Sequence, residues 1–161
     1  MKGSFETNSV EETWALAREF AKDLHPGDVV CLEGDLGAGK TTFTQGLASA
    51  MGVKGRVTSP TFCIVQEHDG RVQQAASSDQ AQKGRESPVF LVHMDLYRLH
   101  GEDDVLSIGW EDYLARGAVL VVEWPERAGA LIPANARHVE IRHVSDESRI
   151  IRIDMGSDSV V

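Results

Sequence analysis

Cysteine is scarce in this 161-residue chain, which contains only Cys31 and Cys63. The two residues form no C-x-x-C pair and match no zinc-ligand spacing, so the sequence offers no zinc module. Each cysteine lies in an apolar, strand-like run. We therefore expect two buried free thiols, as in a protein of a reducing cytosol.

Long apolar runs are also lacking. No run approaches the roughly 20 residues that a membrane-spanning helix needs. The first residues, Met1 to Glu6, show no apolar signal region. These absences predict a cytoplasmic protein without a membrane partner.

Positive charge is in deficit, with 16 Lys and Arg against 25 Asp and Glu and a net charge of −9. A protein that binds nucleic acid unaided normally carries a basic stripe. The balance therefore argues against a DNA-binding protein, and we expect any RNA served by the chain to be held mainly by a partner. Neither Asn8 nor Asn135 begins the Asn-Lys-x-Asp sequence of guanine-specific switches.

Glycine is concentrated in one informative stretch, Gly34-Asp35-Leu36-Gly37-Ala38-Gly39-Lys40-Thr41. It fits the phosphate-loop pattern G-x-x-x-x-G-K-[ST]. Glycines let backbone amides approach phosphate oxygens, lysine reaches the β- and γ-phosphates, and the threonine hydroxyl can bind Mg²⁺. The stretch predicts a nucleotide-binding loop.

The context of this stretch supports the same interpretation. An apolar run at 29–32 predicts a buried strand before the loop, and apolar residues from Phe43 to Met51 recur at helical spacing after it. Upstream, Ser9 and Glu12 form a capping-box pattern that predicts a helix ending before Pro26. Residues at the start of that helix are candidates to approach the nucleotide base. The whole of 1–161 is expected to form one domain.

Two further apolar strands, 89–95 and 118–123, each end in a carboxylate, Asp95 and Glu123. A carboxylate at the end of a buried strand is the form of a Walker B element, and either residue could hold Mg²⁺ directly or through water. His93 and His100 are interpreted as structural or exposed, since no nucleophile or metal set surrounds them. Short helices are expected between the two strands.

Other segments carry weaker signals. Residues 69–88 are polar, which predicts a mobile loop between two antiparallel strands. A C-terminal hairpin is predicted from the alternating segments 138–143 and 149–153. The last residues, 156–161, are expected to fray. Ser59 and Thr61 flank Pro60 in a candidate switch that could sense a γ-phosphate or metal. Arg149 is a candidate to stack on a nucleotide base.

Taken together, the motifs resemble the TsaE family, formerly YjeE, the small ATPase of bacterial tRNA threonylcarbamoyladenosine synthesis. The resemblance extends from the first helix to about Pro133. It is carried by four stretches in order, namely Gly34–Thr42, Ser59–Phe62, His93–Leu99 and Glu123–Glu126.

The resemblance implies an α/β fold of the three-layer P-loop NTPase-like type, with a mixed, largely parallel central sheet and a C-terminal β-hairpin. It also implies ATP and Mg²⁺ as cofactors and slow ATP hydrolysis by the chain alone. The implied partner is the TsaB–TsaD heterodimer, which modifies adenosine 37 of the tRNA, so tRNA would be reached only indirectly. Trp124 is expected near the site.

By motif, the resemblance makes Lys40, Asp95 and Glu123 the catalytic set and Thr41 and Glu123 the metal ligands, with Glu123 preferred to Asp95 for the metal. The residues expected to bind the nucleotide are Gly37, Ala38, Gly39, Lys40, Thr41, Thr42, Ser59, Thr61 and, from its own chemistry, Arg149. The chain departs from the family in its longer 69–88 segment and in Met94, where an aromatic residue is common.

Two alternatives remain open at this point. A small-molecule kinase would need an acceptor pocket and an arginine-rich lid, for which 69–88 offers only Arg71, Lys83 and Arg85. A nucleotide-dependent binding module would need ATP binding but not its cleavage.

Overall fold

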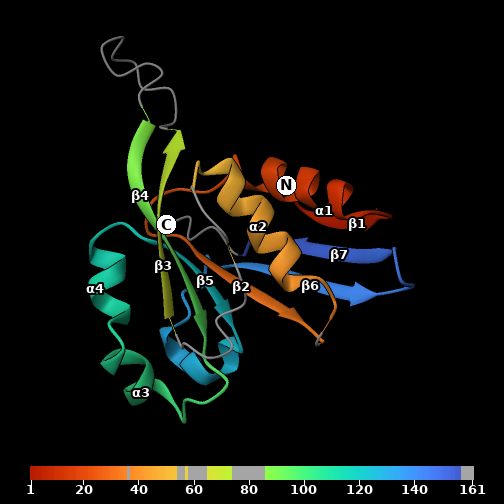
Figure 1. Cartoon of the computed structure of the whole chain (residues 1–161). Helices are drawn as coiled ribbons and strands as arrows, with labels where there is room; N and C mark the ends of the chain where they lie inside the picture. The colour runs from red at the N-terminus through yellow and green to blue at the C-terminus, as the bar shows by residue number, and fades with distance from the viewer. Residues whose placement is uncertain (36, 54–56, 58–64, 74–85, 157–161) are drawn as a thin grey trace.

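The fold is a seven-stranded sheet with helices on both faces, as seen in a computed structural model that describes residues 1–35, 37–53, 57, 65–73 and 86–156 (Figure 1). Its elements follow the chain in the order β1 (Gly3–Thr7), α1 (Val10–Ala21), β2 (Val29–Gly34), α2 (Lys40–Ala50), β3 (Val65–Gln73), β4 (Glu86–Asp95), α3 (Glu102–Ser107), α4 (Trp110–Ala115), β5 (Val119–Glu123), the 3-10 helix η2 (Pro125–Leu131), β6 (Arg137–His143) and β7 (Arg149–Asp154).

The strand order is β1-β7-β6-β2-β5-β4-β3. The central strands β6, β2, β5 and β4 are parallel, whereas β7, β1 and β3 are added antiparallel at the two sides. This is the mixed sheet with a parallel centre that the sequence predicts, and β6 and β7 are the predicted C-terminal hairpin. The carboxyl ends of β2, β4 and β5 meet at one edge, where ligands of open α/β sheets bind.

The fold has three layers, because an apolar cluster on each face of the sheet packs helices against it. α1 and α2 lie side by side on one face, where Phe20 and Phe43 pack with ring centroids 5.7 Å apart (Figure 1). The other face is covered by α3, α4 and η2, where the buried Trp110 belongs to one apolar cluster with Val92 and Leu120. Strands buried on both faces read as continuous apolar runs, which is why β5 is recognisable in the sequence.

The capping box is confirmed: the backbone amide of Glu12 donates to Ser9 Oγ at 3.1 Å, and the Glu12 carboxylate accepts from the amide of Asn8. Cys31 is buried in β2, and burial, followed by the charges of Glu33 and Glu126, raises the pKa of its thiol to about 12. Cys63 lies outside the described residues.

The prediction of a loop over 69–88 is wrong at both ends. β3 continues to Gln73 and β4 begins at Glu86, with Gln73 and Glu86 directly opposite each other. Polar residues can extend an antiparallel pair because the backbone supplies its hydrogen bonds. Residues 74–85 lie outside the described part. Strand β1 is not predicted from the sequence. Among the described helices, none is long and apolar enough to cross a membrane.

Candidate nucleotide-binding site

Glycines occupy both ends of the connection between β2 and α2. Gly39 precedes α2 with φ 110°, in the left-handed region that favours glycine. A Cβ on Gly34 would lie 2.7 Å from the Ile141 carbonyl oxygen, so the loop leaves β2 too close to β6 for any side chain. No side chain caps the start of α2. Its first amides and the positive end of the helix therefore face the loop.

Lys40, the first residue of α2, forms an ion pair at the end of β5. Its Nζ lies 3.1 Å from Glu123 Oε1, and the exposed fractions of the two side chains are 17% and 6%. Glu123 stands opposite Leu32 of β2 and Asp95 of β4, so that β4 and β5 end together while β2 continues to Gly34. The structure thus brings together two of the three predicted catalytic residues.

Glu123 has a second partner, His93 of β4, whose Nε2 lies 2.7 Å from Glu123 Oε2. Burial of the carboxyl opposes its ionisation, but the hydrogen bond and charge of His93, together with Lys40, outweigh burial and lower the pKa of Glu123. The site therefore contains an anionic carboxylate whose two oxygens are each held by a different side chain.

Asp95 is placed differently from Glu123. It ends β4 at the same register, but its Oδ1 accepts a hydrogen bond of 3.1 Å from the backbone amide of Tyr97. The carboxylate that meets Lys40 belongs to Glu123. The predicted preference for Glu123 as the metal-binding carboxylate fits this placement.

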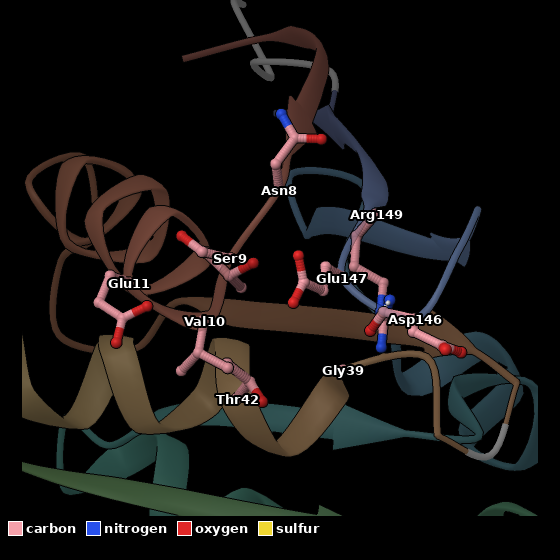
Figure 2. A pocket seen from close by; sticks show the side chains of 10 residues that line it. Asn8, Ser9, Val10, Glu11, Gly39, Thr42, Asp146, Glu147 and Arg149 are labelled. Carbon is pink, nitrogen blue, oxygen red and sulfur yellow. Dashed lines mark hydrogen bonds between the residues drawn. The ribbon is translucent and has the colours of Figure 1, made fainter.

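A cavity of about 320 Å³ lies on one side of the loop. In Figure 2, Ser9 and Val10 from the start of α1 face Glu147 and Arg149, with Gly39 and Thr42 below them. From the sequence, the start of α1 and Arg149 are candidates to approach the nucleotide base, and both line this cavity. Its other lining residues are Asn8, Glu11, Thr13 and Asp146.

Arg149 ties the turn between β6 and β7 to the phosphate loop. Its Nε donates to the carbonyl of Ala38 at 2.8 Å, and its Nη1 donates to the carbonyls of Ser145 and Ser148 at 2.7 and 2.9 Å. The guanidinium therefore links the loop to this turn, and Arg149 also lines the cavity.

A second cavity, of about 300 Å³, lies on the other side of Lys40 and is bordered by Glu33, Gly34, Trp124 and Glu126. Trp124 adopts φ 57° and ψ 53°, an uncommon conformation for a bulky residue. Trp124 is 40% exposed, and its ring centroid lies 5.0 Å from that of Tyr97. Trp124 thus lines the same cavity as Lys40, next to which it was expected.

The remaining predicted residues have varied outcomes. Gly37 and Ala38 are in the loop, and Thr41 and Thr42 are in the first turn of α2, with Thr42 facing the first cavity. Ser59 and Thr61 lie outside the described residues. His93, interpreted from the sequence as structural or exposed, is buried and contacts Glu123, and alternation along 91, 93 and 95 places it on the face of Asp95.

Comparison with known proteins gives a consistent result. A family model described as "Threonylcarbamoyl adenosine biosynthesis protein TsaE" matches residues 7–151. The chain is 37% identical over 145 residues to the tRNA threonylcarbamoyladenosine biosynthesis protein TsaE of Bacillus subtilis, covering 90% of this chain and 80% of the relative. The TsaE protein of Treponema pallidum is 31% identical over 147 residues, covering 91% of this chain and 96% of the relative.

A solved structure is also similar. The crystal structure of Bacillus subtilis YdiB superimposes with a TM-score of 0.68 at 30% identity, over 97% of this chain and 87% of that one.

Proposed function

Because the chain belongs to the TsaE family of threonylcarbamoyl adenosine biosynthesis proteins, we propose that it is a Mg²⁺-dependent ATPase accessory to the TsaB–TsaD complex. In this proposal it binds ATP, hydrolyses it slowly alone and reaches tRNA only through that complex. The observation that carries the proposal is the Lys40–Glu123 pair at the start of α2, where a phosphate chain would lie.

The charge distribution around the loop suits the two ends of a nucleotide. The first cavity carries the carboxylates Glu11, Asp146 and Glu147, which would repel phosphates but can accept hydrogen bonds from a ribose or an exocyclic amine. Lys40 and the amides of α2 offer positive charge at the loop. The geometry therefore favours a nucleoside beside α1 and phosphates over Lys40.

The residues at the site also fit Mg²⁺. The Thr41 hydroxyl and the Glu123 carboxylate are hard oxygen donors of the kind that Mg²⁺ prefers, and this ion usually takes only one or two carboxylates together with substrate phosphates. In the described part of the chain, no cluster of three or more His, Cys, Asp or Glu could form an all-protein metal cage. Thr41 and Glu123 would hold the ion against the nucleotide.

The chemistry follows from these placements. When bound, Mg²⁺ withdraws charge from the phosphate oxygens. Lys40 and the first amides of α2 stabilise the negative charge that develops on the β- and γ-phosphates. Glu123, kept anionic by its partners, orients the metal or the attacking water.

Slow hydrolysis in isolation is supported by what surrounds the pair. Within the described ranges, the ion pairs of Lys40 and Glu123 involve no arginine that could act as an arginine finger. Trp124, whose ring packs against the exposed Tyr97, lines the second cavity, where a protein partner could bind and complete the site.

The test is ATP hydrolysis by the purified chain, with and without the TsaB–TsaD complex. We expect stimulation by the complex and its loss in Lys40→Ala, with a reduction of about 100-fold or more, since a lost electrostatic donor costs that order. Lys22→Ala, which removes an exposed lysine of a surface ion pair, is the matched control. Activity of the complex that needs ATP binding by this chain but not ATP cleavage would favour the binding module, and transfer of phosphate to a small molecule would favour a kinase.

A further inference from the structure

His93 is fully buried on β4, on the sheet face that carries Glu123. A histidine inside an apolar strand costs free energy unless its polar atoms find partners. Its Nε2 has one, Glu123 Oε2 at 2.7 Å. The question is what this contact does for the site.

The two oxygens of Glu123 have different surroundings. Oε1 faces Lys40, whose proposed role is to bind phosphate, while Oε2 faces His93, which is fixed in the sheet. When Lys40 turns to phosphate, the buried carboxylate keeps only the His93 contact among those seen here. His93 is thus the partner that can hold the carboxylate throughout a turnover.

We infer that His93 is a positioning residue, which donates Nε2–H to Glu123 Oε2 and thereby directs Oε1 toward the metal and the phosphates. This inference rests on the function proposed above and adds to it a residue with no assigned role. It also places the support of the site on β4, two residues before the carboxylate of Asp95.

The other ring nitrogen agrees with this arrangement. Among the described residues, His93 Nδ1 has no hydrogen-bond partner. Donation to Glu123 requires a hydrogen only on Nε2 and makes no demand on Nδ1. Second partners of this kind set the orientation of metal ligands, and their loss typically costs about 10- to 100-fold in metal affinity or activity.

The experiment compares His93→Leu, which removes the donor, with His93→Gln, whose amide can place an N–H near the original Nε2. His68→Leu is the matched control, because His68 stands on the same sheet face, opposite Leu91, and the described contacts of Glu123 do not include it. For each full-length variant we would measure ADP affinity without metal, Mn²⁺ affinity of the ADP complex by electron paramagnetic resonance, and kcat and KM for Mg-ATP.

We expect His93→Leu to lower Mn²⁺ affinity and kcat by about 10- to 100-fold, to leave metal-free ADP affinity unchanged, and to be largely rescued in His93→Gln. Equal losses in His68→Leu, a parallel loss of metal-free ADP affinity, or unchanged Mn²⁺ binding would overturn the inference. If the parent chain binds Mn²⁺ and ADP in a His93-dependent way but hydrolyses nothing, the proposed function fails and the inference stands.

Discussion

Glu123 is the point at which three elements of the fold meet through side chains. It ends β5, Lys40 approaches it from α2 and His93 from β4. A buried carboxylate remains ionised only where such partners offset the loss of hydration. The lowered pKa of Glu123 therefore links the stability of the fold to the ionisation of its site.

That link predicts a pH dependence of stability. A carboxyl whose pKa is lower in the folded state contributes stability that is fully present above its ordinary pKa of 4.5 and is lost as the pH falls through the folded value. We expect the free energy of unfolding to drop less between pH 6 and 3.5 in Glu123→Gln than in the parent chain, as measured by urea titration. Glu19→Gln, at an exposed pair, is the control, and an equal drop in all three proteins would refute the link.

At the scale of single residues, the sequence predicts the features that depend on nearby positions in the chain. The capping box and the phosphate-loop residues are visible because each depends on neighbours a few positions away. The contact of His93 with Glu123 spans 30 positions and depends on the register of β4 against β5. The sequence motif contains both residues but does not contain the register.

Helices α1 and α2 meet at a glycine. A Cβ on Gly46 would lie 2.7 Å from the Cβ of Ala17 and 3.0 Å from the Cα of Trp14, so the backbones approach too closely for a side chain. Glycine inside a helix costs about 1 kcal/mol relative to alanine. Close packing of the two helices explains its presence here.

We therefore expect Gly46→Ala to destabilise the protein by about 1–3 kcal/mol, because overpacking against backbone outweighs the gain in helix propensity. Chemical unfolding followed by circular dichroism measures this. Ser49→Ala, at an exposed position of the same helix, should be neutral or slightly stabilising. A stabilised Gly46→Ala would show that the helices separate at little cost.

The hairpin of β3 and β4 supports another prediction. Since Gln73 and Glu86 stand opposite each other, two residues suffice to connect them. Replacing 74–85 with Asn-Gly should leave the melting temperature within a few per cent of the parent value, because a type I′ turn fits such a pair. The nucleotide affinity should stay within about twofold of the parent value. Loss of cooperative unfolding would instead assign 74–85 a part in the fold.

Across the whole molecule, the first strand of the chain pairs with the last. β1 pairs antiparallel with β7, with Gly3 opposite Ile153, and the amino group of Met1 lies 2.7 Å from Asp23 Oδ2. The sequence did not predict β1, because five residues exposed on most positions carry little apolar signal. It did predict the parallel centre, whose apolar strands are buried on both faces.

The pairing of the first and last strands predicts that a circular permutant will fold. Joining Val161 to Met1 through a Gly/Ser linker and opening the chain within 74–85 keeps every described strand pair intact. We expect cooperative unfolding within about 2 kcal/mol of the parent, since all strand pairs of the described sheet are retained. A permutant opened inside α2 is the control that should not fold.

The strand that carries the phosphate loop has a consequence for synthesis of the protein. β2 pairs with β5 and β6 on its two sides. Residues 29–34 can therefore form their strand pairs only after segments about ninety or more positions downstream have been synthesised. A nascent chain that has left the ribosome as far as α4 contains the entire glycine-rich motif but neither strand that flanks it. Parallel pairing over such separations is slow to form, and the nucleotide site is therefore among the last parts of the molecule to assemble.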